Sequence, residues 1–143
     1  GPAPDAAWVL NPEDCGLIGS LDRLTAEQAS AAPSSGGASI AAHVDHLRYG
    51  LALLNRSIRG EKPFVDADYA ASWQRGTVSH TEWAARREAL RAEAYAWREA
   101  LEHSRDVTGD ELTAVVASVA HLAYHLGAIR QIDRSIRGPS ARD

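Results

Sequence analysis

Apolar side chains recur at alternating spacings of four and three residues along most of this chain, and that pattern predicts helices. It is clearest in residues 39–58, where one face of a helix is expected to be buried. The apolar positions on that face are Ile40, Val44, Leu47, Leu51, Leu54 and Ile58. Ser39 is well suited to cap the start of this helix, and Gly60 and Pro63 are expected to end it.

The same spacing predicts three further helices, each of which begins at or after a residue suited to capping. Their expected starts are Asn11-Pro12, either Ser79 or Thr81, and Asp110. In the third helix Trp83 and Trp97 fall at core spacing, and the last helix is expected to run to about Ile136. A long connection, residues 61–79, follows the second helix. Because no segment alternates with period two for long enough to form a strand, we predict an all-α protein, a four-helix bundle.

The composition is that of one ordinary globular domain, residues 1–143, with 45% hydrophobic and 24% charged residues. The leading Gly1-Pro2 is interpreted as a remnant of tag cleavage. A net charge of −4 without a basic stripe argues against nucleic-acid binding. The single cysteine, Cys15, excludes an internal disulfide and is interpreted as a buried, inert thiol. No signal peptide and no apolar run of ~20 residues is recognised, so we expect a cytoplasmic protein without a membrane partner.

Two histidines four residues apart, His121 and His125, lie on the most apolar predicted helix. Residues at i and i+4 have Cβ atoms roughly 5–6 Å apart, so both imidazoles can reach one cation at the ~2.0–2.1 Å of a Zn–N bond. At ~100° per residue both border the apolar stripe around Leu122, which places a chelating pair beside the core. Histidines that only make hydrogen bonds in the core or at the surface are the structural alternative.

A third ligand is expected from residues 39–58, which carry His43 and His46. Helical geometry places His43 slightly closer to the apolar stripe, but the stripe is wide enough to include His46, so periodicity leaves the choice open. Three protein ligands leave one coordination position for water or substrate, which is the arrangement of a catalytic zinc. Zinc, nickel, iron and copper all suit a site of three imidazoles.

The segments Ser39-Ile-Ala-Ala-His43-Val-Asp-His46 and His121-Leu-Ala-Tyr-His125, in this order, resemble the DinB/YfiT-like family of metalloenzymes. The resemblance covers almost the whole chain. It implies a four-helix bundle with one long crossover and a divalent metal, such as zinc, nickel or iron, bound by a histidine triad. The triad would consist of His46, seven residues after the small polar residue that opens its helix, and the pair His121 and His125.

The same resemblance leaves His43 for a catalytic or ligand-orienting role beside the metal. Many relatives follow the last histidine with Arg-Gly-Gln, whereas this chain has Leu126-Gly127-Ala128, so polar groups that could contact a substrate are missing here. The loop aromatics Tyr69 and Trp73, with Arg75, are expected to cover the end of the bundle; closing over the site is the alternative.

The resemblance implies a metal-dependent enzyme, since relatives include S-transferases that use the thiols bacillithiol or mycothiol, and mycothiol-dependent isomerases. A coordinated low-molecular-weight thiol is deprotonated, which would activate it toward a small electrophile. A metal-bound water with a pKa near ~7 would instead support hydrolysis. The alternative function is a non-catalytic module that sequesters a small molecule or a metal.

Four further expectations concern the surface. Asp45 falls away from the buried stripe and is expected to be solvated, while Tyr49 is expected either to line the mouth of the site or to pack. Tyr124 points away from the core, toward solvent or a subunit contact. Alanine-rich helix faces would allow two copies to approach closely, so a homodimer is an expectation as well.

Overall fold

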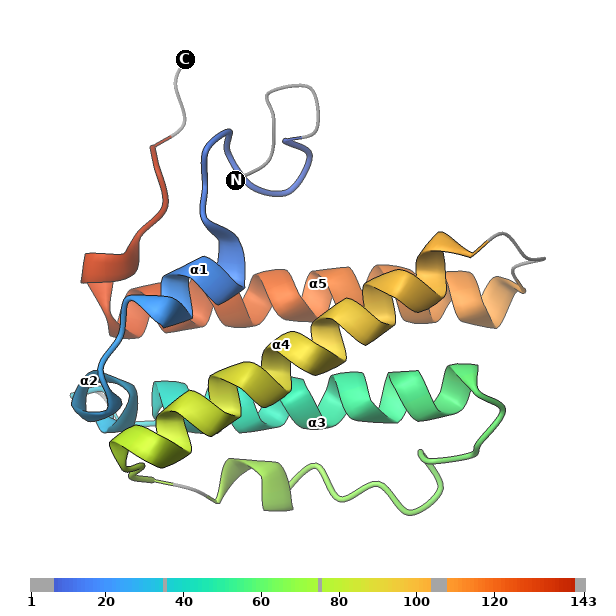
Figure 1. Cartoon of the computed structure of the whole chain (residues 1–143), viewed down its shortest axis with the longest axis horizontal. Helices are drawn as coiled ribbons and strands as arrows, with labels where there is room; N and C mark the ends of the chain where they lie inside the picture. The colour runs from blue at the N-terminus through green and yellow to red at the C-terminus, as the bar shows by residue number, and fades with distance from the viewer. Residues whose placement is uncertain (1–6, 35, 75, 104–107, 141–143) are drawn as a thin grey trace.

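The computed structural model describes residues 7–34, 36–74, 76–103 and 108–140, and it is all-helical over these ranges. Gly1-Pro2 and Arg75 lie outside them. Figure 1 shows three long helices and two short ones near the N-terminus. The α-helices are α1 (Gly16–Asp22), α2 (Ala26–Ser30), α3 (Ile40–Ile58), α4 (His80–Glu102) and α5 (Gly109–Ile132). Two 3-10 turns, η2 (Ala71–Trp73) and η3 (Arg134–Ile136), complete the elements of the described ranges.

Side-chain caps set the starts of the long helices. Ser39 accepts a hydrogen bond from the amide of Ala42 at the start of α3. Ser79, one of the two candidates from the sequence, caps α4 through a capping box with Glu82. The expected cap of the last helix was wrong, because Thr108 and not Asp110 occupies that position, in a capping box with Glu111. The hydroxyls satisfy amides that have no partner within the helix.

The N-terminal prediction of one helix beginning at Asn11-Pro12 was also wrong. Glu13 and Gly16 have φ angles of 67° and 68°, which the right-handed helix does not contain, and α1 starts only at Gly16. The chain breaks again at Thr25, which forms a capping box with Gln28 and opens the separate helix α2.

The end of the last helix also differs from the prediction. α5 stops at Ile132 because Asp133 adopts an extended conformation, with φ −121° and ψ 105°, and η3 follows it.

The core lies around α3, which contacts α4, α5, α2 and η2, while α5 also contacts α1. In Figure 1, α4 crosses obliquely in front of α3 and α5. The largest fully buried apolar side chains are Leu21, Ile40, Val44, Leu47, Leu90, Ile129 and Ile136. Trp83 and Trp97 are buried as their spacing predicts, and their indole N–H groups donate to the Leu24 carbonyl and to Ser118 Oγ.

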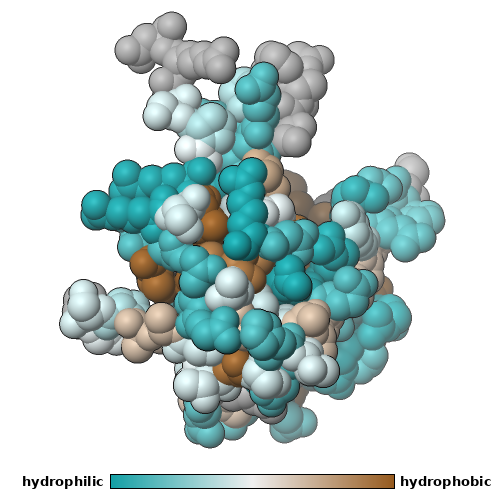
Figure 2. Space-filling view, turned by 60° about the vertical axis from the view of Figure 1, so that its left-hand side comes forward, coloured by the Kyte–Doolittle hydropathy of each residue, from teal (hydrophilic) through white to brown (hydrophobic). Residues whose placement is uncertain are grey.

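The sequence was expected to contain no apolar run of ~20 residues, but α5 is such a helix, and its outer face is apolar. This helix is long and apolar enough to cross a membrane by length and composition alone, and only 22% of its most apolar window is buried. A single helix of this kind is weak evidence for a membrane. Its exposed apolar side chains are Leu112, Val116, Val119 and Tyr124. Figure 2 brings the end with α2 and η3 forward, where small apolar patches interrupt a mainly hydrophilic surface.

Candidate metal centre

Four histidines meet between α3 and α5, beside the turn η2. The Nε2 atom of His121 lies 3.1 Å from that of His46 and 2.9 Å from that of His125. One ligand nitrogen from each of these three residues lies within 4.8 Å of the other two. On the far side of His125, its Nδ1 lies 2.8 Å from Nδ1 of His43. Both histidines of α3 therefore reach the cluster, but through different contacts.

The local sequence explains why the imidazoles converge. His121 and His125 are one turn apart on α5 and point the same way, as the i, i+4 spacing requires. His43 and His46 are three residues apart on α3, which packs against η2. His46 and His125 are buried, and His121 and His43 are half-buried.

Ser72 sets the tautomer of His46, that is, which ring nitrogen carries the proton. The Ser72 hydroxyl donates to the Tyr69 carbonyl at 2.6 Å, so its oxygen is left to accept the bond from His46 Nδ1 at 2.9 Å. His46 therefore carries its proton on Nδ1, and the lone pair of Nε2 points at the other two histidines. This is the arrangement in which an outer hydrogen bond orients a metal-ligating imidazole.

The same logic applies to His125, because a proton on its Nδ1 can be donated to His43 Nδ1 and leaves Nε2 free. Ligands bound at 2.0–2.1 Å in a tetrahedral site are separated by roughly 3.3 Å. The observed 2.9 and 3.1 Å separations are within a few tenths of an ångström of that value. The donor set therefore fits a divalent transition metal.

Burial keeps these imidazoles neutral. It lowers the pKa of His46 to about 4, with smaller contributions from His121 and His43. Burial likewise lowers the pKa of His125 to about 3, with contributions from the three neighbouring histidines, and it lowers the pKa values of His43 and His121. A neutral imidazole is the form that binds a metal, so at neutral pH no proton has to be displaced.

Tyr69 and Trp73, in the connection after α3, lie against the histidines, which was the alternative to covering the end of the bundle. The indole of Trp73 stacks on His46 with ring centroids 4.2 Å apart, and it meets His43 edge-on at 5.2 Å. Tyr69 lies 6.0 Å from His46 and 5.6 Å from Tyr49. Tyr49 accepts a hydrogen bond from the amide of Asp68, which fixes the connection on α3.

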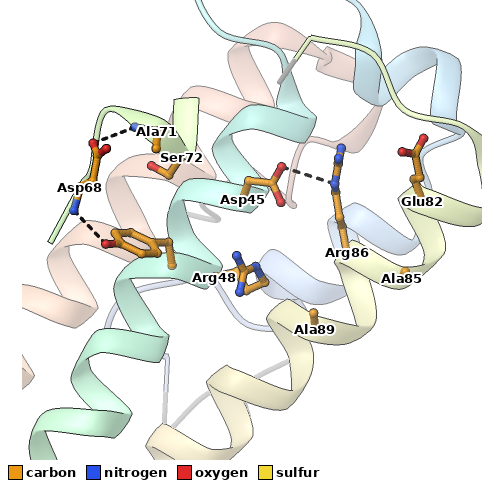
Figure 3. Close-up of a pocket in the computed structure, with 10 residues that line it drawn as sticks. Asp45, Arg48, Asp68, Ala71, Ser72, Glu82, Ala85, Arg86 and Ala89 are labelled. Atoms are coloured by element: carbon orange, nitrogen blue, oxygen red, sulfur yellow. Dashed lines mark hydrogen bonds and ion pairs between the residues drawn. The ribbon is translucent and has the colours of Figure 1, made fainter. Parts of the chain in front are cut away.

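The expectation of a solvated Asp45 was wrong. Its carboxylate is buried and lies 3.3 Å from Arg86 Nε of α4, as Figure 3 shows. The reason is tertiary, because α4 packs against α3 and brings Arg86 to this carboxylate. A cavity of about 480 Å³ opens beside this pair and is lined also by Arg48 and Ser72.

Sequence reasoning missed Ser72 altogether. It lies in the connection, where no periodicity marks inward positions, and the candidates there were Tyr69, Trp73 and Arg75. Gly50 was missed as well, although it lies one turn beyond His46 on the same helix and beside His121.

These observations define an all-helical protein with a cluster of three convergent histidines that can hold a metal ion. The sequence model of the DinB superfamily matches residues 17–129, and the chain belongs to this superfamily. No curated protein and no solved structure matches the chain.

Proposed function

We propose that this protein is a metal-dependent enzyme whose divalent cation, zinc, nickel or iron, is held by His46, His121 and His125. The observation that carries the proposal is the convergence of three neutral imidazole nitrogens from two helices. Apolar packing alone does not account for it, since nitrogen lone pairs that face one another gain nothing without a proton or a cation between them. We also propose that the helices form a four-helix bundle with one long crossover, in which α1 and α2 together take the place of one helix.

The bound metal would supply a Lewis acid that lowers the pKa of a coordinated thiol. We propose a low-molecular-weight thiol as cosubstrate and a small electrophile as substrate. The thiol would lose its proton to solvent, its sulfur would bond to the electrophilic carbon, and the leaving group would depart with the electron pair of the broken bond. Hydrolysis by a metal-activated water is the related alternative.

The surrounding residues have distinct parts in this scheme. Ser72 holds His46 in the tautomer that binds a metal, and His43 holds His125 through the contact between their Nδ1 atoms. Trp73 excludes water from one side of the triad by stacking on His46. His43 lies beside the triad and is the candidate for the catalytic acid or base.

Elemental analysis of protein prepared without chelator tests the metal site. We expect about one equivalent of zinc, nickel or iron per chain in the wild type and its loss in His46→Ala, His121→Ala and His125→Ala. His80→Ala is the matched control, because that exposed imidazole lies at the surface, paired with Glu27. Absence of metal from the wild type after reconstitution with each of these ions would refute the proposal.

Sequestration of a small molecule is the second candidate function, favoured by an apolar cavity of about 290 Å³ that reaches His121. The two functions differ in the fate of the ligand. An enzyme supplied with a thiol and an electrophile, for example cysteine and 1-chloro-2,4-dinitrobenzene, releases an altered product above the uncatalysed rate. A sequestering module returns the compound unchanged.

We also propose that a second copy of this chain covers the outer face of α5. Residues 112–129 contain no Asp, Glu, Lys or Arg, so two copies can meet there without burying an unpaired charge. Val116 and Tyr124 are 61% and 69% exposed, and a two-fold axis would bury both in each copy. A monomeric protein that binds lipid vesicles through this face would refute the dimer.

A further inference from the structure

A second cavity lies between α3 and α5, on the side of His121 away from His43. It has a volume of about 290 Å³. Among its lining residues the apolar ones are Leu47, Leu51, Leu54, Phe64, Ala114, Ala117 and Leu122. No charged residue lines it, and its polar side chains are those of His121, Tyr69 and Ser118. Ser118 is already engaged, since it accepts from Trp97 and donates to the Val115 carbonyl.

Gly50 keeps this cavity open at the histidine. It lies in the interior of a 19-residue helix, where glycine costs about 1 kcal/mol relative to alanine. The helix does not need it, because its φ is negative and an added Cβ would meet only His121 Cε1, at an ordinary 3.9 Å. On the opposite wall the small residues Ala114 and Ala117 face the same space. Small side chains on both helices thus preserve a passage to His121.

The apolar cavity and the cavity of Figure 3 differ in chemistry. The cavity of Figure 3 is lined by five charged residues, whereas this one has none. The five are Asp45, Arg48, Asp68, Glu82 and Arg86. The contact between Tyr49, which lines the charged cavity, and Tyr69, which lines the apolar one, lies between them. A charged cosubstrate would lose its hydration in the apolar cavity without finding a partner, so that cavity selects an uncharged ligand.

We propose that this cavity binds the apolar body of the electrophilic substrate and places its reactive carbon beside His121, with Gly50 as the residue that determines ligand size. The inference rests on the proposed function. A volume of about 290 Å³ lies at the lower end of the ~300–1,000 Å³ typical of small-molecule pockets. It therefore suits a single or fused aromatic ring, or a short branched aliphatic chain, and not a peptide or a nucleotide.

The test uses 1-naphthol as an uncharged probe and follows backbone amides of ¹⁵N-labelled full-length protein during titration. We expect saturable shifts at Gly50, Ala114 and Ala117. In Gly50→Leu and in Ala117→Leu, each of which fills the cavity from one wall, the dissociation constant should rise at least tenfold. Ala89→Leu is the matched control in the charged cavity and should bind within twofold of the wild type.

Metal content is measured on the same samples, which separates failure of this inference from failure of the proposed function. The two cavity variants should retain the metal while losing 1-naphthol, and His125→Ala should lose the metal while retaining 1-naphthol. Shifts centred on Ala89, or unchanged binding in both cavity variants, would overturn the inference even if the metal is present. A wild type that binds 1-naphthol but never a metal would overturn the proposed function and with it the assignment of the ligand as substrate.

Discussion

Replacing Ser72 with alanine removes the hydroxyl that accepts the hydrogen bond from His46 Nδ1 at 2.9 Å. His46 is buried, so the Nδ1–H group loses its partner without gaining full access to water. An unsatisfied buried donor costs about 1–3 kcal/mol, and about 1.4 kcal/mol corresponds to a tenfold change in a binding constant. The imidazole can avoid that cost by turning or changing tautomer, and either change removes the Nε2 lone pair from the triad.

We therefore expect Ser72→Ala to weaken metal binding by about 10- to 100-fold, the range found for residues that orient metal ligands. Competition between the protein and a chromophoric chelator for zinc at pH 7.5 measures the dissociation constant directly. Ser72→Thr retains the hydroxyl and should recover most of the affinity. Ser57→Ala, near the end of the same helix α3, should leave it unchanged.

Circular dichroism distinguishes a specific effect from unfolding, because η2 lies at the surface and its variants should retain the helical spectrum and a cooperative melt. A Ser72→Ala variant that is folded and binds zinc within twofold of the wild type would refute the reasoning. It would mean that Ser72 does not select the tautomer of His46.

The remaining predictions concern stability and assembly. Because the folded-state pKa values of His46 and His125 lie near 4 and 3, below their unfolded value near 6.5, metal-free protein should be fully stable above pH 6.5. Between pH 6.5 and 4 its free energy of unfolding should fall by at most about 1.4 kcal/mol per pH unit for each histidine, as urea titrations measure. Asp45→Ala should destabilise by about 3–5 kcal/mol by leaving Arg86 buried without its partner, and the double variant with Arg86→Met should recover most of that loss. Val116→Glu should convert a dimer into a monomer in light scattering coupled to size exclusion.

Each of these outcomes has a counterpart that would contradict it. A free energy of unfolding that does not change between pH 7 and pH 5, or that changes equally in His125→Gln, would remove the histidines as its cause. Additive losses in the Asp45 and Arg86 double variant would show that the two side chains are not coupled. A Val116→Glu protein with the same mass in solution as the wild type would place any dimer contact elsewhere.

Much of the helical fold was predictable because its determinants are local. In α3 the apolar period and the Ser39 cap act within a few residues of one another, so the sequence predicts this helix closely. The prediction of one helix in the N-terminal segment was wrong for an equally local reason. The positive φ angles at Glu13 and Gly16 and the capping box at Thr25 interrupt the helix despite its apolar pattern.

The proximity of the His121 and His125 imidazoles was predictable, because a spacing of four residues on one helix brings two side chains together whatever surrounds them. Periodicity could not choose between His43 and His46, since both lie near the apolar stripe of their helix. The structure brings both to the cluster and distinguishes them by contact. His46 presents Nε2 to His121, whereas His43 meets the Nδ1 atom of His125.

By itself, the amino-acid sequence determined the all-helical class, the three long helices and which histidines share a helix face, because these depend on interactions within one or two turns. Only the tertiary structure decided that Ser72 and Trp73 lie on His46, that α4 buries Asp45, and that Gly50 opens a cavity at His121. Those contacts join residues from different elements. Their formation depends on how whole helices pack, which the period of any single helix does not encode.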